Sequence, residues 1–272
     1  ALVGFIKGGL SMINIATSMF FAEISGSAVA DVAALGSILI PAMKKKGYPG
    51  PFAAAVTSSS ASLAIIIPPS IPMIVYAVMA QSSVVQLFVA GVVPGIIGGF
   101  LMMFAAYIYA RRKNLPIEEN FNLVNLRKTA KEAALAFLLP IIILGGIFGG
   151  VVTATEGAGL AVVAALVIGL IYREFDFKRL YQAATEGAIQ TAAVMLLVAA
   201  SALLGEFLTV EQIPQKVAES IIDMTQNKYA VLAILNVFLL IIGFFLHSVA
   251  AIILTVPIVM PLVNAVGIDP VH

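Results

Sequence analysis

The stretch Phe20–Tyr76 decides the fold: FFAEISGSAVADVAALGSILIPAMKKKGYPGPFAAAVTSSSASLAIIIPPSIPMIVY. It is as apolar as membrane-spanning helices are, yet Ser25-Gly26-Ser27, the serine run at 58–60 and the Pro68-Pro69 pair interrupt it. Hydrocarbon holds no water for backbone groups, so irregular backbone at membrane depth is tolerated only inside protein or against a water-filled cavity. The interruptions therefore predict a polar site in mid-membrane, as in transporters whose broken helices bind cargo and coupling ion.

The composition supports an all-α polytopic membrane protein. Of 272 residues, 61% are hydrophobic and 11% are charged, whereas soluble domains are about 45–50% apolar and about 25% charged. The net charge of +1 gives no indication of a nucleic-acid partner, and the absence of cysteine excludes disulfides and thiolate metal sites. The first residue is not Met and the chain stops without a recognisable ending, so we expect a piece of a longer protein.

The basic residues predict the topology. Twelve of the 15 Lys and Arg residues fall into four groups, at 44–46, 111–113, 127–131 and 173–179. The positive-inside rule places all four groups on the cytoplasmic side. Both ends of segment 1–46 can then face the cytoplasm, which predicts a re-entrant hairpin with its tip at Ser25–Ser27, and a full crossing and return is the alternative. The following apolar segments would cross alternately, while the amphipathic segments around 111–132 and 207–227 would lie at the inner and outer interfaces.

The end of the chain repeats its beginning. Pro41 precedes Gly47 by six residues, and Pro261 precedes Gly267 by the same distance. Counting back from each proline places Ser27 opposite His247, at the turn between the last two apolar arms. If the two hairpins enter from opposite sides, they form an inverted-topology repeat, whose interface is expected to hold the site near the midplane.

Four stretches together resemble the large membrane subunit of TRAP transporters, the DctM-type permease: SGSAVADVAALGSILIPAMKKKGY, FAAAVTSSSASLAIIIPPSIPMIVY, TATEGAGLAVV and TVPIVMPLVNAVGIDPVH. The resemblance implies an elevator-type carrier of the ion-transporter superfamily in a bacterial or archaeal cytoplasmic (inner) membrane. It implies sodium-coupled uptake of an organic acid anion that a periplasmic substrate-binding protein delivers. It also implies a small membrane subunit, separate or fused, and a second Pro-Pro break beyond His272.

In that carrier, residues 1–110 and 228–272 would form the moving transport part. Residues 133–206 would form the scaffold, and 111–132 and 207–227 would be the arms that join the two. No cofactor is expected, and sodium would be the coupling ion. The runner-up function is a stand-alone sodium/organic anion symporter of the same superfamily that needs no binding protein.

The candidate site residues lie at the tips and at the break. Hydroxyls and freed carbonyls offer oxygen ligands to a small cation, and helix N-termini offer N–H groups to an anion. The residues expected around sodium are Ser25, Gly26, Ser27, Ser62, Ile67 and Pro68. Those expected around substrate are Ser27, Pro69, Ser70, His247 and Ser248. Small residues also let helices approach closely, and we favour this packing interpretation for the serine run at 58–60.

Two carboxylates have structural interpretations. Asp31 lies one turn past the first tip, and we expect it to hydrogen-bond between helices, with a proton site or a cap near the tip as the alternatives. Glu156 follows Thr153 by three residues, the spacing of a capping box. An intramembrane hydrolase is disfavoured, because Ser27 and His247 have no orienting acid in the sequence pattern. A channel is also disfavoured, because a pore does not need matched hairpins, so we do not expect an enzyme.

Overall fold

The computed structural model describes residues 5–117, 123–173, 176–225 and 227–272, and this part of the chain is helical without strands. Five of its helices are long and apolar enough to cross a membrane, which confirms the prediction of a helical multi-pass membrane protein. These candidate spans are Val84–Arg112, Ala154–Ile171, Phe177–Leu208, Lys228–Phe245 and Ser248–Ala265. The chain divides into two compact units, one of residues 1–73 and 88–174 and the other of residues 74–87 and 175–272.

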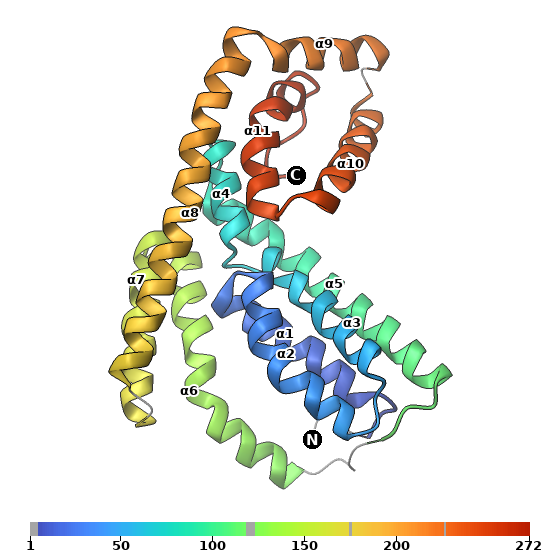
Figure 1. Ribbon diagram of the computed structural model, residues 1–272, viewed down its shortest axis with the longest axis vertical. Helices are drawn as coiled ribbons and strands as arrows, with labels where there is room; N and C mark the ends of the chain where they lie inside the picture. Colours follow the sequence, from blue (N-terminus) through green and yellow to red (C-terminus); the bar gives the residue numbers. More distant parts are fainter. Residues whose placement is uncertain (1–4, 118–122, 174–175, 226) are drawn as a thin grey trace. The chain divides into compact units, whose positions relative to one another are not determined.

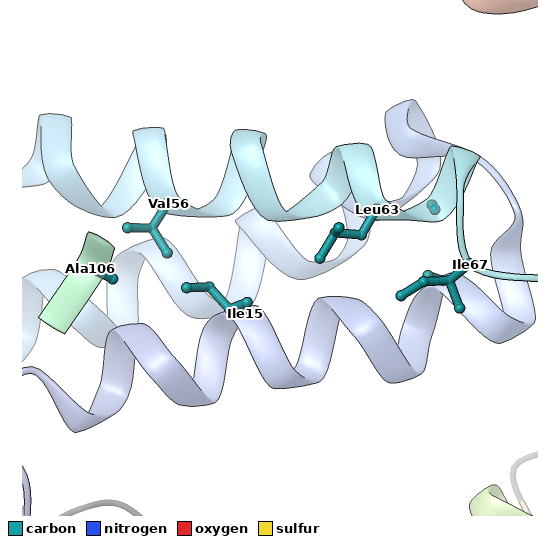
Figure 2. Close-up of a cluster of buried hydrophobic side chains, with 7 residues drawn as sticks. Ile15, Val56, Leu63, Ile67 and Ala106 are labelled. Atoms are coloured by element: carbon teal, nitrogen blue, oxygen red, sulfur yellow. The ribbon is translucent and has the colours of Figure 1, made fainter. Parts of the chain in front are cut away.

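Three neighbouring helices form the body of the first unit (Figure 1): α1 (Gly9–Ser25), α2 (Ala28–Lys45) and α3 (Gly50–Ala61). The short 3-10 helix η1 (Ser62–Ile65) extends α3 toward the Pro68-Pro69 break. The apolar core between them is shown in Figure 2, where Ile15 of α1 lies between the levels of Val56 and Leu63 on the facing helix. Ala106 of α5 (Val84–Arg112) closes the same core.

Polar side chains also join α1 to α3. The Asn14 amide donates a hydrogen bond of 2.7 Å to the Thr57 hydroxyl, and the hydroxyls of Ser18 and Ser60 lie 2.8 Å apart. All four side chains are buried. In a membrane these contacts add to van der Waals packing, which has no hydrophobic driving force to help it there.

Helix α5 lies against the break through Gly91 and Gly95, and Gly99 on the same face lies against Met19 of α1. A Cβ on Gly91 would be 2.6 Å from the Ile66 carbonyl oxygen, and one on Gly95 would be 2.6 Å from the Ile67 side chain. Four-residue spacing places these positions on one side of a helix. The absence of side chains there lets α5 approach the irregular backbone closely and hold it in place.

The remaining helices of the first unit are α6 (Leu123–Phe148) and α7 (Ala154–Ile171), which pack against each other. The Thr153 hydroxyl accepts from the Glu156 backbone N–H, and the Glu156 carboxylate accepts from the Thr153 backbone N–H. This confirms the predicted capping box. Helix α6 begins at Leu123. The described end of the inner arm expected at 111–132 is therefore continuous with α6, and no glycine or proline interrupts residues 123–139.

The second unit contains α4 (Ile71–Met79, from Ile74 onward), α8 (Phe177–Val210), α9 (Ile213–Met224), α10 (Lys228–Phe245) and α11 (Ser248–Ala265). Helix α9 packs on α11 around the buried side chains of Ala218, Val231 and Leu262. The Tyr76 hydroxyl donates a 2.6 Å hydrogen bond to the carbonyl of Pro270, so α4 is joined to the segment that follows α11.

The two hairpins share their local geometry at a constant offset of 220 residues. Helices α2 and α11 each have 18 residues and begin at equivalent positions after Ser27 and His247. Each helix is followed, two residues beyond its end, by a left-handed glycine, Gly47 at φ 85° and Gly267 at φ 67°. The hydrogen bonds there also correspond, since the N–H of residue 48 bonds the carbonyl of 43 as that of 268 bonds the carbonyl of 263. The predicted sequence repeat is therefore also a repeat of backbone conformation.

Candidate ion and substrate site

The first tip is a tight turn between α1 and α2. Gly26 ends α1 in the left-handed region at φ 59° and ψ 14°, and its N–H bonds the Ala22 carbonyl. Ser27 is extended, and its hydroxyl accepts from the Ala30 N–H at 3.5 Å, so it caps the N-terminus of α2. The Ser27 N–H in turn bonds the Ser25 hydroxyl at 3.2 Å. The three residues predicted for the tip thus end one helix and begin the next.

The break follows η1 and ends where α4 begins. The Pro68-Pro69 peptide bond is cis, and neither proline has an N–H to donate. The Ser70 hydroxyl donates to the Ile65 carbonyl at 2.9 Å and accepts from the Met73 N–H at 3.5 Å, so Ser70 bridges the break and caps α4. Ser70 and Pro68 are buried. The expected interruption of this helix is therefore present at the predicted residues.

Tip and break touch each other. The Ile71 N–H donates to the Gly26 carbonyl at 3.4 Å. A Cβ on Gly26 would lie 2.9 Å from the Pro69 carbonyl oxygen and 3.3 Å from the Ile71 nitrogen. Residues that are more than 40 positions apart in the chain are thus held in backbone contact. Gly26 is required here both by its left-handed conformation and by the closeness of the break.

A buried carboxylate lies beside this contact. Asp31 is fully buried, and its Oδ1 accepts a hydrogen bond from the Ser25 hydroxyl. Its Oδ2 is buried without a hydrogen-bond partner among the described residues. The Ser25 bond confirms the expected link between the two helices of the hairpin. The second oxygen is different, because a buried carboxylate oxygen without a donor is costly unless something else satisfies it.

Helix ends of both polarities surround the contact. The C-terminal end of α1 and the N-terminal ends of α2 and α4 all lie within a few residues of Gly26. Helix N-termini carry positive partial charge and favour anions, whereas free carbonyls at C-termini favour cations. Together with the Asp31 carboxylate, the arrangement offers ligands to a cation and an anion side by side.

Ser62, Ile67 and Pro68 are also predicted site residues, and Pro68 is itself part of the break. The Ser62 hydroxyl donates to its own helix at the Ser59 carbonyl, at 2.6 Å. The side chains of Ile67 and Pro68 line a pocket of about 390 Å³ together with Glu23. The pocket is otherwise apolar, and its walls include Phe20, Val92, Phe100 and Phe148. Any part that Ile67 and Pro68 play in ion binding therefore falls to their backbone carbonyls.

The second tip belongs to the other unit. His247 is exposed and caps α11 through its backbone, with its carbonyl accepting from the Ala251 N–H at 2.9 Å and no capping hydrogen bond from its side chain. Ser248 is the first residue of α11 and is half-buried. The residue before His247 is the extended Leu246, where the first tip has the left-handed Gly26. The tips therefore match in position but differ in the turn itself.

Comparison with known proteins shows which family the chain belongs to. A family model described as "Tripartite ATP-independent periplasmic transporter, DctM component" matches residues 1–272. The chain belongs to the DctM family. This DctM-family chain is 40% identical, over its whole length, to the C4-dicarboxylate TRAP transporter large permease protein DctM of Pseudomonas aeruginosa, of which it covers 64%. It is 40% identical to the isethionate TRAP transporter permease protein DctMQ of Oleidesulfovibrio alaskensis, covering 43% of that protein.

A third relative is the sialic acid TRAP transporter large permease protein SiaM of Vibrio cholerae, 35% identical over the whole chain, which covers 64% of it. The chain thus spans less than two thirds of the length of these curated relatives. All three names describe transporter permeases, and DctM is a family of transporter components.

Proposed function

We propose that the chain is part of the large permease of a tripartite transporter that takes up an organic acid anion together with sodium. Family membership supports the transport reaction. The observation that carries the site is the contact of the Ser25–Ser27 tip with the Pro68-Pro69 break beside the unpartnered Asp31 Oδ2.

The chemistry of the tip fits a sodium ion. The Ser25 hydroxyl, the Asp31 carboxylate and the carbonyls of the break are oxygen ligands, and unwound backbone carbonyls coordinate sodium in transporters with broken helices. The negative charge of Asp31 would be compensated by the ion, so the carboxylate that is costly when alone becomes favourable when sodium binds. Ser62 is a weaker candidate, because its hydroxyl is already bonded within its own helix.

The anion would lie at the N-terminal ends of α2 and α4. Ser27 and Ser70 cap these helices, and the positive N-terminal helix ends attract carboxylate or sulfonate oxygens. The three relatives are named for C4-dicarboxylates, isethionate and sialic acid, which all carry such a group. His247 and Ser248 are also proposed to contact the substrate, and the equivalent backbone of α2 and α11 supports their correspondence to the first tip.

Coupling of solute uptake to sodium requires that part of the protein moves. The two hairpins would be re-entrant and would carry ion and substrate across the bacterial inner membrane in an elevator motion against the scaffold. Sodium can shift that equilibrium only by binding the two orientations, or the loaded and empty carriers, with different affinity. A small membrane subunit and a periplasmic substrate-binding protein would complete the system.

Uptake into proteoliposomes tests the proposal. The full-length permease with its small subunit would be reconstituted, and solute uptake would be measured under an inward sodium gradient with and without the binding protein. Uptake that needs both sodium and the binding protein supports the tripartite function. Sodium-driven uptake without the binding protein would favour the stand-alone symporter, and uptake that ignores the gradient would overturn sodium coupling.

A further inference from the structure

Three segments that are distant in sequence meet at one end of the first unit. The Lys7 amine donates a 2.5 Å hydrogen bond to the Asn114 side chain, and the Gly8 N–H bonds the Pro116 carbonyl at 3.3 Å. The Tyr48 hydroxyl accepts from the Leu10 N–H at 3.3 Å. The start of α1, the end of α2 and the end of α5 are therefore packed against one another.

An apolar and aromatic core fixes this end. The rings of Tyr48 and Phe52 stack with their centroids 6.4 Å apart, and the ring centroids of Phe52 and Tyr109 are 4.2 Å apart. Met43, Ala110 and Leu115 are buried around them. Because Met43, Tyr48, Tyr109, Ala110 and Leu115 each lie within two residues of a basic stretch, the core sets where the cations lie.

The result is a cluster of seven basic side chains, which we call the basic rim: Lys7, Lys44, Lys45, Lys46, Arg111, Arg112 and Lys113. Six of them are exposed and Lys7 is half-buried. Among the described residues none of the seven forms an ion pair, since the one ion pair found there joins Arg179 and Asp176. Glu118 and Glu119 lie outside the described residues.

The helix dipole accounts for only some of the basic residues in the basic rim. Lys44, Lys45, Arg111 and Arg112 lie in the last turns of α2 and α5, where cations interact favourably with the helix dipole. That effect falls off within one turn and is screened by salt. It gives no reason for the three helix-external cations, nor for gathering all seven at one place.

The surroundings of the basic rim indicate a lipid. Helix α5 is a candidate membrane span, and its side chains at Phe100, Phe104 and Ile108 are exposed within the turns that precede Arg111. In a bilayer the acyl chains would cover these side chains, and the headgroups would then meet the basic residues that follow. Arginine binds phosphate oxygens in a bidentate way, and lysine and arginine reach the interface along their aliphatic stems.

We propose that the basic rim binds the phosphate groups of anionic phospholipids in the cytoplasmic leaflet. The negative surface of that leaflet attracts clusters of basic residues beside a membrane span. This inference goes beyond the proposed transport reaction and does not depend on it, because lipid binding can be measured without any uptake.

The test compares lipid selectivity of the full-length permease in vesicles of phosphatidylcholine that contain spin-labelled phosphatidylglycerol or spin-labelled phosphatidylcholine. Electron paramagnetic resonance gives the association of each label with the protein. The unaltered permease should prefer phosphatidylglycerol. The triple variant Lys44→Gln, Lys45→Gln and Lys46→Gln should lower that preference at least about threefold, as expected from the loss of several interfacial cations.

Two matched variants control for folding and for net charge. Replacing Arg173, Lys178 and Arg179 by glutamine removes the same number of cations from another basic group of the chain, in which Arg179 is paired with Asp176, and should lower the preference less. Replacing Lys44, Lys45 and Lys46 by arginine should retain it. An equal loss in the 173–179 variant, no loss in the 44–46 glutamine variant, or displacement of the phosphatidylglycerol label by inorganic phosphate in solution would each overturn the proposal.

Discussion

The hydroxyl of Ser25 donates a hydrogen bond to the carboxylate of Asp31 across the turn that joins α1 to α2. This bond satisfies one oxygen of a fully buried carboxylate and leaves the other without a partner among the described residues. The turn is also the place where the first hairpin touches the Pro68-Pro69 break. A carboxylate with one unpartnered oxygen and the ends of three helices therefore coincide at one point of the first unit.

Asp31→Asn should impair the response to sodium. The amide keeps the size of the side chain and can still bond Ser25, but it removes the negative charge that we assign to the ion. We expect the sodium concentration for half-maximal uptake to rise at least about tenfold, which corresponds to about 1.4 kcal/mol of ion binding. The measurement is uptake into proteoliposomes over a range of sodium gradients.

Glu23→Gln is the matched control for that prediction. Glu23 is the second acidic residue of the hairpin, but its side chain faces the apolar pocket of about 390 Å³. The sodium dependence of uptake should therefore stay the same in this variant. An equal shift in both variants would show that the effect is one of hairpin charge in general and would remove Asp31 from the ion site.

Gly26→Ala should reduce uptake by about tenfold or more. An alanine in the left-handed region costs about 1–2 kcal/mol, and its Cβ would lie 2.9 Å from the Pro69 carbonyl oxygen. The tip or the break must then shift. Gly159→Ala in α7 is the control, because a Cβ there meets nothing within 4 Å. Wild-type uptake by the Gly26 variant would contradict the assigned contact.

Ser27→Leu should abolish uptake while the protein is still made and inserted. The larger side chain loses the cap of α2 and fills the space at the N-terminal helix end where we place the anion. Ser37→Leu on the exposed face of the same helix is the comparison. Uptake and membrane abundance would be measured together, and unchanged transport by the Ser27 variant would remove the tip from the substrate site.

Local signals in the sequence predicted the hairpin turns, the break and the capping box, because each depends on residues close together in the chain. The contact between Gly26 and the break is different, since it pairs residues more than 40 positions apart. Proximity of this kind was expected from the logic of broken helices, but which atoms meet was not. Helix α8 begins at Phe177, because the charged and polar residues at its start are ordinary helix formers.

The sequence interpretation missed the polar contacts of α1. Ser11, Asn14 and Ser18 lie three and four residues apart, which places them on one helical face, and all three are buried. That periodicity was a usable signal. Their partners could not be predicted, because the choice of Thr57 and Ser60 depends on how α3 packs beside α1. For Ser60, the packing interpretation of the serine run is confirmed.

The bond between Asn14 and Thr57 should stabilise the first unit. A double-mutant cycle of Asn14→Ala and Thr57→Val is expected to give a coupling energy of about 0.6 kcal/mol, and at most about 1.7 kcal/mol, as for other hydrogen bonds between membrane helices. Thermal unfolding of the purified full-length permease in detergent would measure it. Pairing Asn14→Ala with Ser58→Ala is the control, because Ser58 is exposed and bonds only its own helix among the described contacts. No coupling in the first cycle would contradict the assigned bond.

The repeated backbone at the ends of α2 and α11 predicts that two distant substitutions have the same effect. Gly47 and Gly267 both have a left-handed conformation and follow helices of equal length. A Cβ meets no protein atom closer than 4.0 Å at either position, so packing adds little and backbone strain alone should decide. Each change to alanine should therefore destabilise the full-length permease by about 1–2 kcal/mol.

Gly187→Ala within α8 is the control and should be neutral or stabilising by about 1 kcal/mol, since alanine is the better helix former there. Clearly unequal losses at 47 and 267 in thermal unfolding would show that the two hairpin ends are not energetically equivalent.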